Sequence, residues 1–230
     1  MKFAARWLRR TLLLALALIV GAQLWFFANI LWWRMADPSQ TRFMQRTQAE
    51  LQARKPPARL EYTWVPYERI SLHLKRAVIA AEDGHFLEHN GFDWAGIQYA
   101  LEKNRARGQL RAGGSTITQQ LAKNLFLSPS RSLLRKGQEA VITLMIEATW
   151  SKRRILEVYL NVAQWGDGIF GAEAAARHYF GVPAARLSAA QSARLAVMLP
   201  SPRRYGRLFG RAQMARAGRI LSYMGGAQTP

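Results

Sequence analysis

The feature that most restricts the fold is a long uncharged stretch, TLLLALALIVGAQLWFFANILWW, at residues 11–33. As an α-helix it would be about 34 Å long at about 1.5 Å per residue, and the hydrocarbon core of a bilayer is about 30 Å thick. Its polar members, Gln23 and Asn29, are not ionisable. It ends in Trp32 and Trp33 followed by an arginine, an anchor typical of the membrane interface. The stretch therefore predicts one transmembrane helix.

A cleaved signal peptide is the alternative interpretation. Its apolar region would be shorter and would end in small residues at a cleavage site, whereas bulky residues continue the run at 24–27. The residues before the stretch are basic: Lys2, Arg6, Arg9 and Arg10. Positive charge there predicts a cytoplasmic N-terminus and a C-terminal domain across the membrane. Basic residues also follow the stretch, within residues 34–55, and weaken this preference.

The remaining chain of this 230-residue protein suggests one compact domain. We expect a basic tail at 1–10, a proline-punctuated linker with a short helix at 34–65, and the domain at 66–230. The formal net charge of +19 predicts attraction to polyanions, namely nucleic acid, anionic lipid headgroups or a phosphorylated substrate. The absence of cysteine excludes disulfides, a cysteine zinc site and a cysteine nucleophile.

Apolar residues spaced three and four positions apart predict helices through most of the compact domain. The expected helices cover residues 72–81, 92–101, 116–125, 139–148, 155–160, 172–178 and 188–199. No segment shows the alternation of a half-buried strand. The predicted fold class is therefore mainly α.

The stretch EDGHFLEHNG, residues 82–91, is compatible with two chemistries. HFLEH matches H-x-x-E-H, a zinc-protease pattern in which His85 and His89 would be ligands. Zinc would need both histidines on one helical turn and a third ligand elsewhere. The asparagine-glycine pair that follows is a turn signal that would end such a helix. The same letters also match E-D-x-x-F-x-x-H-x-G, which makes Glu82 a candidate catalytic carboxylate.

Three further strings are unusual. RAGGSTITQQLAKNLFL (111–127) has a glycine pair, then Ser115 or Thr116 as the expected cap of a helix whose first N–H groups would be free to face an anion. Its adjacent glutamines and the Lys-Asn pair that follows are better explained as residues that line a groove than as a solvated helix face. RSLLRKGQE (131–139) and KRRILEVYLN (152–161) are the other two.

In this order and spacing the four strings resemble the peptidoglycan glycosyltransferases of family 51. The segments of that family are E-D-x-x-F-x-x-H-x-G, G-[GA]-S-T-[IL]-T-Q-Q-L-x-K-N, R-K-x-x-E and R-I-L-E-x-Y-L-N, and each is matched here without a mismatch. The resemblance covers about residues 64–224. It implies a lysozyme-like helical domain with a small membrane-proximal lobe, and the N-terminal stretch suits the anchored, monofunctional enzymes of Gram-negative bacteria.

Such enzymes polymerise lipid II, a disaccharide-pentapeptide on a polyprenyl diphosphate, during cell wall biosynthesis. The 4-hydroxyl of the acceptor GlcNAc attacks C1 of the donor MurNAc, the lipid diphosphate leaves, and the anomeric centre inverts. A sugar hydroxyl is a weak nucleophile that must lose its proton as the bond forms. The resemblance implies that Glu82 accepts this proton.

The resemblance also implies roles for the other site residues. Glu139 would be the second catalytic glutamate. The substrate- and diphosphate-binding residues would be Lys123, Arg131, Lys136, Ser115, Thr116, Gln119 and Gln120. The supporting residues would be Asp83, His89 and Asn124. A divalent metal, Mg or Mn, is expected on the substrate diphosphate, with Glu139 as its candidate protein ligand.

The implied partners are lipid II, the growing glycan chain, membrane lipids, and cell-division or elongation proteins, without nucleic acid. The implied location is the bacterial inner membrane, single-pass, with the catalytic domain in the periplasm. Segment 126–134 would present leucines to lipid or bury them in an ordinary helix end. The arginine-rich segment 202–219 fits anionic lipid or glycan phosphate better than nucleic acid, because the anchor delivers the domain outside.

Other functions explain less of the sequence. A lysozyme-like hydrolase or lytic transglycosylase would also use a glutamate in a helical cleft, but its sugar leaving group would not need the cations of QQLAKN and RKGQE. A bifunctional penicillin-binding protein is excluded for this chain, which has no S-x-x-K or K-T-G motif and no length for a transpeptidase domain. A non-enzymatic membrane scaffold would leave the four strings unexplained.

Overall fold

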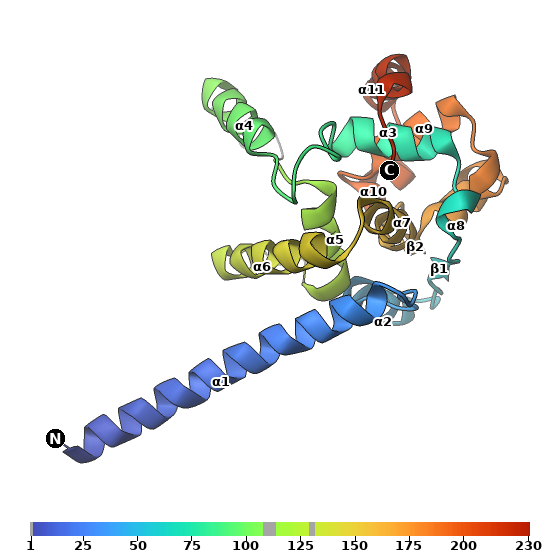
Figure 1. Ribbon diagram of the computed structural model, residues 1–230. Coiled ribbons are helices and arrows are strands. Elements are labelled where there is room, and N and C mark those ends of the chain that lie inside the picture. Colours follow the sequence, from blue (N-terminus) through green and yellow to red (C-terminus); the bar gives the residue numbers. More distant parts are fainter. Residues whose placement is uncertain (1, 108–113, 129–131) are drawn as a thin grey trace.

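The computed structural model describes residues 2–107, 114–128 and 132–230, and Figure 1 shows a mainly helical domain from which one long helix projects. The α-helices are α1 (Lys2–Trp33), α2 (Arg42–Gln52), α3 (Leu72–Glu82), α4 (Trp94–Arg107), α5 (Ile117–Phe126), α6 (Leu133–Thr149), α7 (Lys152–Val162), α8 (Ala172–Phe180), α9 (Ala189–Met198), α10 (Pro202–Arg207) and α11 (Arg211–Tyr223). The short elements are β1 (Glu61–Tyr62), β2 (Ile169–Phe170) and the 3-10 turns η1 (Tyr67–Arg69), η2 (Ala184–Arg186) and η3 (Met224–Gly226). The predicted mainly α class is confirmed.

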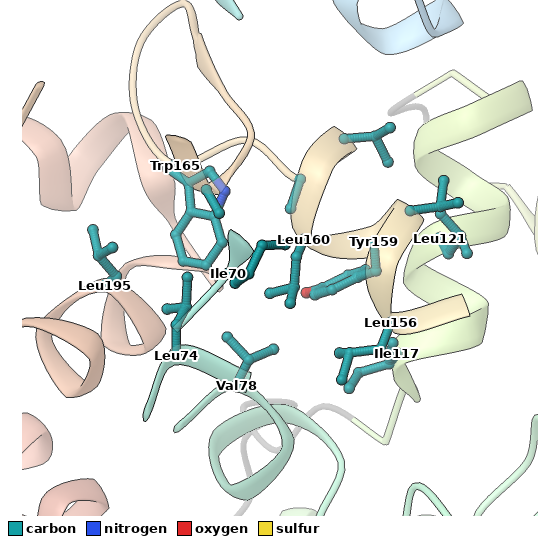
Figure 2. Packing of buried hydrophobic residues seen from close by; sticks show 14 of the residues in the cluster. Ile70, Leu74, Val78, Ile117, Leu121, Leu156, Tyr159, Leu160, Trp165 and Leu195 are labelled. Carbon is teal, nitrogen blue, oxygen red and sulfur yellow. The ribbon is translucent and has the colours of Figure 1, made fainter. Parts of the chain in front are cut away.

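The core forms around α7. Its sequence ILEVYLNV is apolar on more than one face, and all of residues 155–162 except Glu157 are buried. In Figure 2, Leu156, Tyr159 and Leu160 of α7 lie between the buried side chains of α3 and those of α5. Burying one large apolar side chain contributes about 1.5–3 kcal/mol. This packing fixes α5, and α3 is held chiefly by its packing on α9. These two helices hold most of the candidate site.

Segment 34–65 was predicted to be a linker with a short helix, and this helix packs on the domain. The helix is α2, in which the Thr41 hydroxyl caps the first turn by accepting from Met44 N at 3.2 Å. Met44 and Leu51 are buried, because the apolar positions of α2 repeat at helical spacing and face α5. Further along, β1 pairs in parallel with β2.

Helix α1 contains the stretch Arg6–Trp33, which is long and apolar enough to cross a membrane, and no other helix in the described ranges meets both conditions. Its last part is docked on the domain. Ile30 is buried, and its carbonyl accepts from Trp150 Nε1 at 2.8 Å. Gln23 and Gln138 exchange two side-chain hydrogen bonds of 2.8 and 3.0 Å. A cleaved signal peptide would remove Ile30 from the packing, so this docking favours a retained anchor.

Helices α1 and α6 are in contact, and α6 lies on the side of the domain that faces α1 (Figure 1). The first turn of α6 carries two exposed leucines. Its Leu133 and Leu134 are 91% and 89% exposed. Of the two alternatives for segment 126–134, exposed leucines are therefore the one observed for these two residues; residues 129–131 lie outside the described ranges. By contrast, α11 packs on α3 and α9, at the opposite end of the domain from α1.

Candidate active site

Glu82 is the last residue of α3 and lines a cavity of about 390 Å³. Its Oε2 accepts a hydrogen bond from Gln120 Nε2 at 2.9 Å. Burial is the largest influence on the carboxyl and raises its pKa; the Gln120 bond and the charges of Arg216 and Lys123 act in the opposite direction. A carboxylate whose pKa is raised towards neutral is a better proton acceptor than an ordinary surface glutamate.

One buried carboxylate ties the loop after Glu82 to the start of α5. Asp83 Oδ1 lies 2.8 Å from His89 Nε2, and Gly91 N donates to His89 Nδ1 at 3.1 Å. The other oxygen, Asp83 Oδ2, accepts from Ile117 N at 2.9 Å. The Gly91 bond assigns the lone pair to Nδ1, so the Nε2 hydrogen points at Asp83. These contacts are those that a supporting role for Asp83 and His89 requires.

The far end of the same loop is held by α6 and α7. Lys152 Nζ donates to the His89 carbonyl at 2.6 Å and to Glu147 Oε1 at 2.9 Å. Gly91 has φ +90°, and a Cβ there would lie 2.6 Å from Thr143 Cγ2. The predicted turn at this position therefore needs glycine for two reasons, the backbone angle and the close approach of α6.

The zinc-protease interpretation does not fit this geometry. Both ring nitrogens of His89 already have protein partners. His85 is exposed and pairs with Asp93 at 3.3 Å. No group of three histidine, aspartate or glutamate side chains in the described parts of the chain could hold a metal ion. HFLEH is therefore part of a loop built around Asp83.

The start of α5 differs from the expectation that its N–H groups face an anion. Ile117 N is bonded to Asp83, and Gln119 N donates to Thr116 Oγ1 at 3.2 Å. Thr116 N in turn donates to Gln119 Oε1 at 3.0 Å, which completes a capping box. Thr116 and Gln119 are both buried, although each contributes to a cavity wall. The first turn of α5 is thus satisfied by the protein itself.

A cluster of cations surrounds Glu139, which is only 3% exposed on α6. Arg135 Nη1 donates to Glu139 Oε2 at 2.6 Å, and Lys136 Nζ donates to Oε1. Burial, with added repulsion from Arg135 and Lys136, lowers the pKa of Lys123, whereas the Glu139 charge raises it. Three cations around one carboxylate leave an excess of positive charge, which an anionic ligand would neutralise.

The Glu82 cavity and the cation cluster are neighbours. A second cavity of about 240 Å³ is lined by Lys136 and shares Gly114 and Ser115 with the first. Lys136 Nζ also donates to Ser115 Oγ at 3.3 Å. Lys123 is close enough to both Glu82 and Glu139 for each charge to affect its pKa. A ligand could therefore contact the Glu82 carboxylate and the cations at the same time.

Two predicted site residues remain to be placed. Arg131 lies outside the described residues. Asn124 is buried on α5, one position after Lys123.

The residues present do not fit a metal ion held by the protein alone. Both oxygens of Glu139, the candidate ligand, have cationic partners. Within the described ranges no second and third acidic or histidine ligand stands close enough to complete a site. An ion that depends on Glu139 would have to displace Arg135 and Lys136.

Sequence reasoning missed three side chains that act on the site. Arg135 was seen only as part of a basic string, although its spacing of four from Glu139 on a helix predicts the pair. Tyr159, whose hydroxyl donates to Gln120, was treated as an apolar helix position. Arg216 affects the Glu82 carboxyl from α11. No local signal connects it with Glu82, because only the packing of α11 on α3 brings them together.

Comparison with known proteins identifies the family of the chain. A profile described as Transglycosylase matches residues 48–224. The chain belongs to the transglycosylase family. The domain of this family is lysozyme-like, and the chain shares its mainly helical architecture. The matched range begins inside α2, in the segment predicted as a linker.

Relatives of this transglycosylase resemble it over their whole length. The chain is 63% identical to a protein of Azoarcus sp. (strain BH72) and 62% identical to one of Aromatoleum aromaticum, each time over 230 residues and all of both chains. It is 59% identical to one of Thiobacillus denitrificans over 226 residues, 98% of this chain and 97% of the relative. All three are named biosynthetic peptidoglycan transglycosylase. The identity extends through α1, and this N-terminal apolar helix fits a membrane-anchored protein.

Proposed function

We propose that this transglycosylase polymerises lipid II into glycan strands for the cell wall, with loss of polyprenyl diphosphate. The observation that carries the proposal is the arrangement of Glu82 beside a cavity whose neighbour is lined by Lys136, with Lys123 in electrostatic reach of both glutamates. One end of this site can accept a proton and the other can receive a diphosphate. A hydrolase that releases a sugar would not use the second end.

Glu82 is proposed as the general base for the acceptor GlcNAc 4-hydroxyl. Its Oε2 is held by Gln120, and Oε1 has no hydrogen-bond partner among the described residues, so Oε1 is available to the incoming hydroxyl. The proton moves to this oxygen as the bond to the donor C1 forms. General-base assistance of this kind contributes about 10²–10⁴-fold to the rate.

Lys123, Arg135 and Lys136 are proposed to stabilise the departing diphosphate, with Arg131 as a further expected contact. Negative charge grows on this group as the glycosidic bond breaks, and preorganised cations aimed at growing charge are usually the largest catalytic contribution. Glu139 orients Arg135 and Lys136 through its two oxygens. These two ion pairs keep Arg135 and Lys136 from pairing with other groups before the substrate binds.

The predicted Mg or Mn ion is proposed to arrive with the substrate, carried on its diphosphate. Ser115, through its bond to Lys136, and Gln120, through its bond to Glu82, are proposed to shape the wall between the two ends. Thr116, Gln119 and Asn124 support that wall from within α5.

The orientation proposed is an N-terminus in the cytoplasm and a catalytic domain in the periplasm, as the charges before α1 predict. Contact with anionic lipid is assigned to the exposed leucines in the first turn of α6, a helix that contacts α1. Within segment 202–219, Arg203 and Arg207 pair with Glu50 and Asp167. The arginines of α11 lie at the other end of the domain from α1, so the growing glycan is the better partner for them. Cell-division or elongation proteins remain expected partners.

The experiment is polymerisation of lipid II by Glu82→Gln, which keeps the shape of the side chain and removes the base. We expect no glycan polymer with substrate binding retained. Glu88→Gln is the matched control, because Glu88 is an exposed carboxylate in the same loop. Polymer formation by Glu82→Gln at the wild-type rate would remove Glu82 from the mechanism.

A further inference from the structure

A chain of two hydrogen bonds leads from the core to Glu82. The Tyr159 hydroxyl of α7 donates to Gln120 Oε1 at 3.0 Å, and Gln120 Nε2 donates to Glu82 Oε2 at 2.9 Å. Tyr159 is 1% exposed and points between α3 and α5 in Figure 2. Nothing in its packing alone requires a hydroxyl, because the ring is surrounded by apolar side chains such as Leu121 and Leu156.

The hydroxyl restricts how the Gln120 amide can be oriented. A glutamine amide can rotate by half a turn and exchange its oxygen with its NH₂ group at little steric cost. After such a rotation the NH₂ would face the tyrosine, and the hydroxyl hydrogen would lose Gln120 Oε1, its one acceptor among the described residues. A buried hydroxyl without an acceptor is costly. Tyr159 therefore favours the orientation in which the NH₂ group faces Glu82.

We propose that Tyr159 is a positioning residue, which locks the Gln120 amide so that it always donates to Glu82 Oε2 and leaves Oε1 as the basic oxygen in the cavity. The inference rests on the proposed role of Glu82. It adds a function to a core residue that is not among the residues lining the two cavities.

The orientation of the Gln120 amide affects the protonation of Glu82. A rotated amide would present its oxygen to Glu82 and would accept a hydrogen bond from the protonated carboxyl, which favours the inactive form of the base. The charged groups around Glu82 are Asp83 beside it, Lys123 on α5 and Arg216 on α11. None of them is changed by removing the Tyr159 hydroxyl. The expected result is a higher pKa for Glu82 when the lock is absent.

The test is Tyr159→Phe, which removes one oxygen and keeps the ring in the core. The first readout is the midpoint of Glu82 titration, followed by ¹³C NMR of carboxyl-labelled glutamate and assigned by the signal that Glu82→Gln lacks. The second readout is the pH dependence of turnover with lipid II. Tyr179→Phe is the matched control, because its half-buried hydroxyl donates to Trp165 O at 3.2 Å.

We expect turnover by Tyr159→Phe to fall about tenfold on the acidic side of the profile and to approach the wild-type value at high pH, since a tenfold effect corresponds to about one pKa unit. KM should stay constant, and Tyr179→Phe should behave as wild type. In a Gln120→Met background, Tyr159→Phe should produce no further change in the titration of Glu82, because the amide that it orients is gone.

The outcomes separate the two proposals. If both the titration midpoint of Glu82 and the pH profile of turnover shift, the positioning role of Tyr159 and the catalytic role of Glu82 are supported. If the titration midpoint shifts and the pH profile of turnover does not, the positioning role is supported and Glu82 is contradicted as the base. An unshifted titration, or a loss of turnover that is equal at every pH, overturns the lock.

Discussion

Replacement of Glu139 by glutamine tests the reasoning about the cation cluster. The side chain is buried, and its two oxygens bind Arg135 and Lys136, which are 18% and 44% exposed. Removing one partner of a fully buried ion pair costs about 3–5 kcal/mol, whereas exposed pairs contribute about 0–1 kcal/mol. Because both cations reach solvent, we place Glu139→Gln between these limits, at about 1–2 kcal/mol of lost stability.

The same change should lower turnover, because the cations lose their orientation and Lys123 loses the nearby charge that most favours its protonated form. Loss of one preorganised donor typically costs about 10²–10³ in turnover, and we expect about 10² here. Chemical denaturation and a lipid II polymerisation assay measure the two effects. Glu102→Gln is a suitable control, since Glu102 is an exposed helical carboxylate that bonds Gln98 on α4. Wild-type stability and turnover in Glu139→Gln would refute the reasoning.

Two further predictions concern the packing around the site. Asp167, whose pKa is lowered to about 2 chiefly by its bond to Arg54, stabilises the fold above pH about 4, and this stabilisation disappears as pH falls towards 2. Asp167→Asn should therefore lower the melting temperature at pH 6 but not at pH 2, and equal differences at both pH values would contradict this. Gln23→Leu should lower thermal stability in detergent by removing the two bonds to Gln138, whereas Asn29→Leu, which loses only a bond within α1, should not.

The secondary structure and the membrane anchor follow from local sequence. Helical spacing of apolar residues predicted α3, α5, α7, α8 and α9, and the uncharged run predicted α1, because burial and membrane insertion depend on positions that are near one another in the chain. The packing of α2 on the domain was not predicted, since proline and polar residues mask its buried stripe. Only the packing of α2 on α5 shows that stripe to be part of the domain.

The resemblance predicted the residues of the candidate site, but it did not predict the contacts between them. Thr116 and Gln119 were expected to face a ligand, and they line the two cavities but also cap the start of α5 through each other. Asp83, from a loop 34 positions earlier, accepts from Ile117 N. Tyr159 could not be recognised as a site residue, because a buried tyrosine in a helical stripe has the spacing of any core residue. Its link to Glu82 passes through Gln120, which sequence spacing does not reveal.

The proposed activity of this chain builds glycan strands and does not degrade them. The most direct measurement gives the purified full-length transglycosylase either lipid II or finished peptidoglycan, and follows polymer length, released polyprenyl diphosphate and soluble fragments. We predict polymer from lipid II, with one diphosphate released for each bond formed, and no fragments from finished peptidoglycan. Soluble fragments from finished peptidoglycan, without polymer from lipid II, would contradict the account.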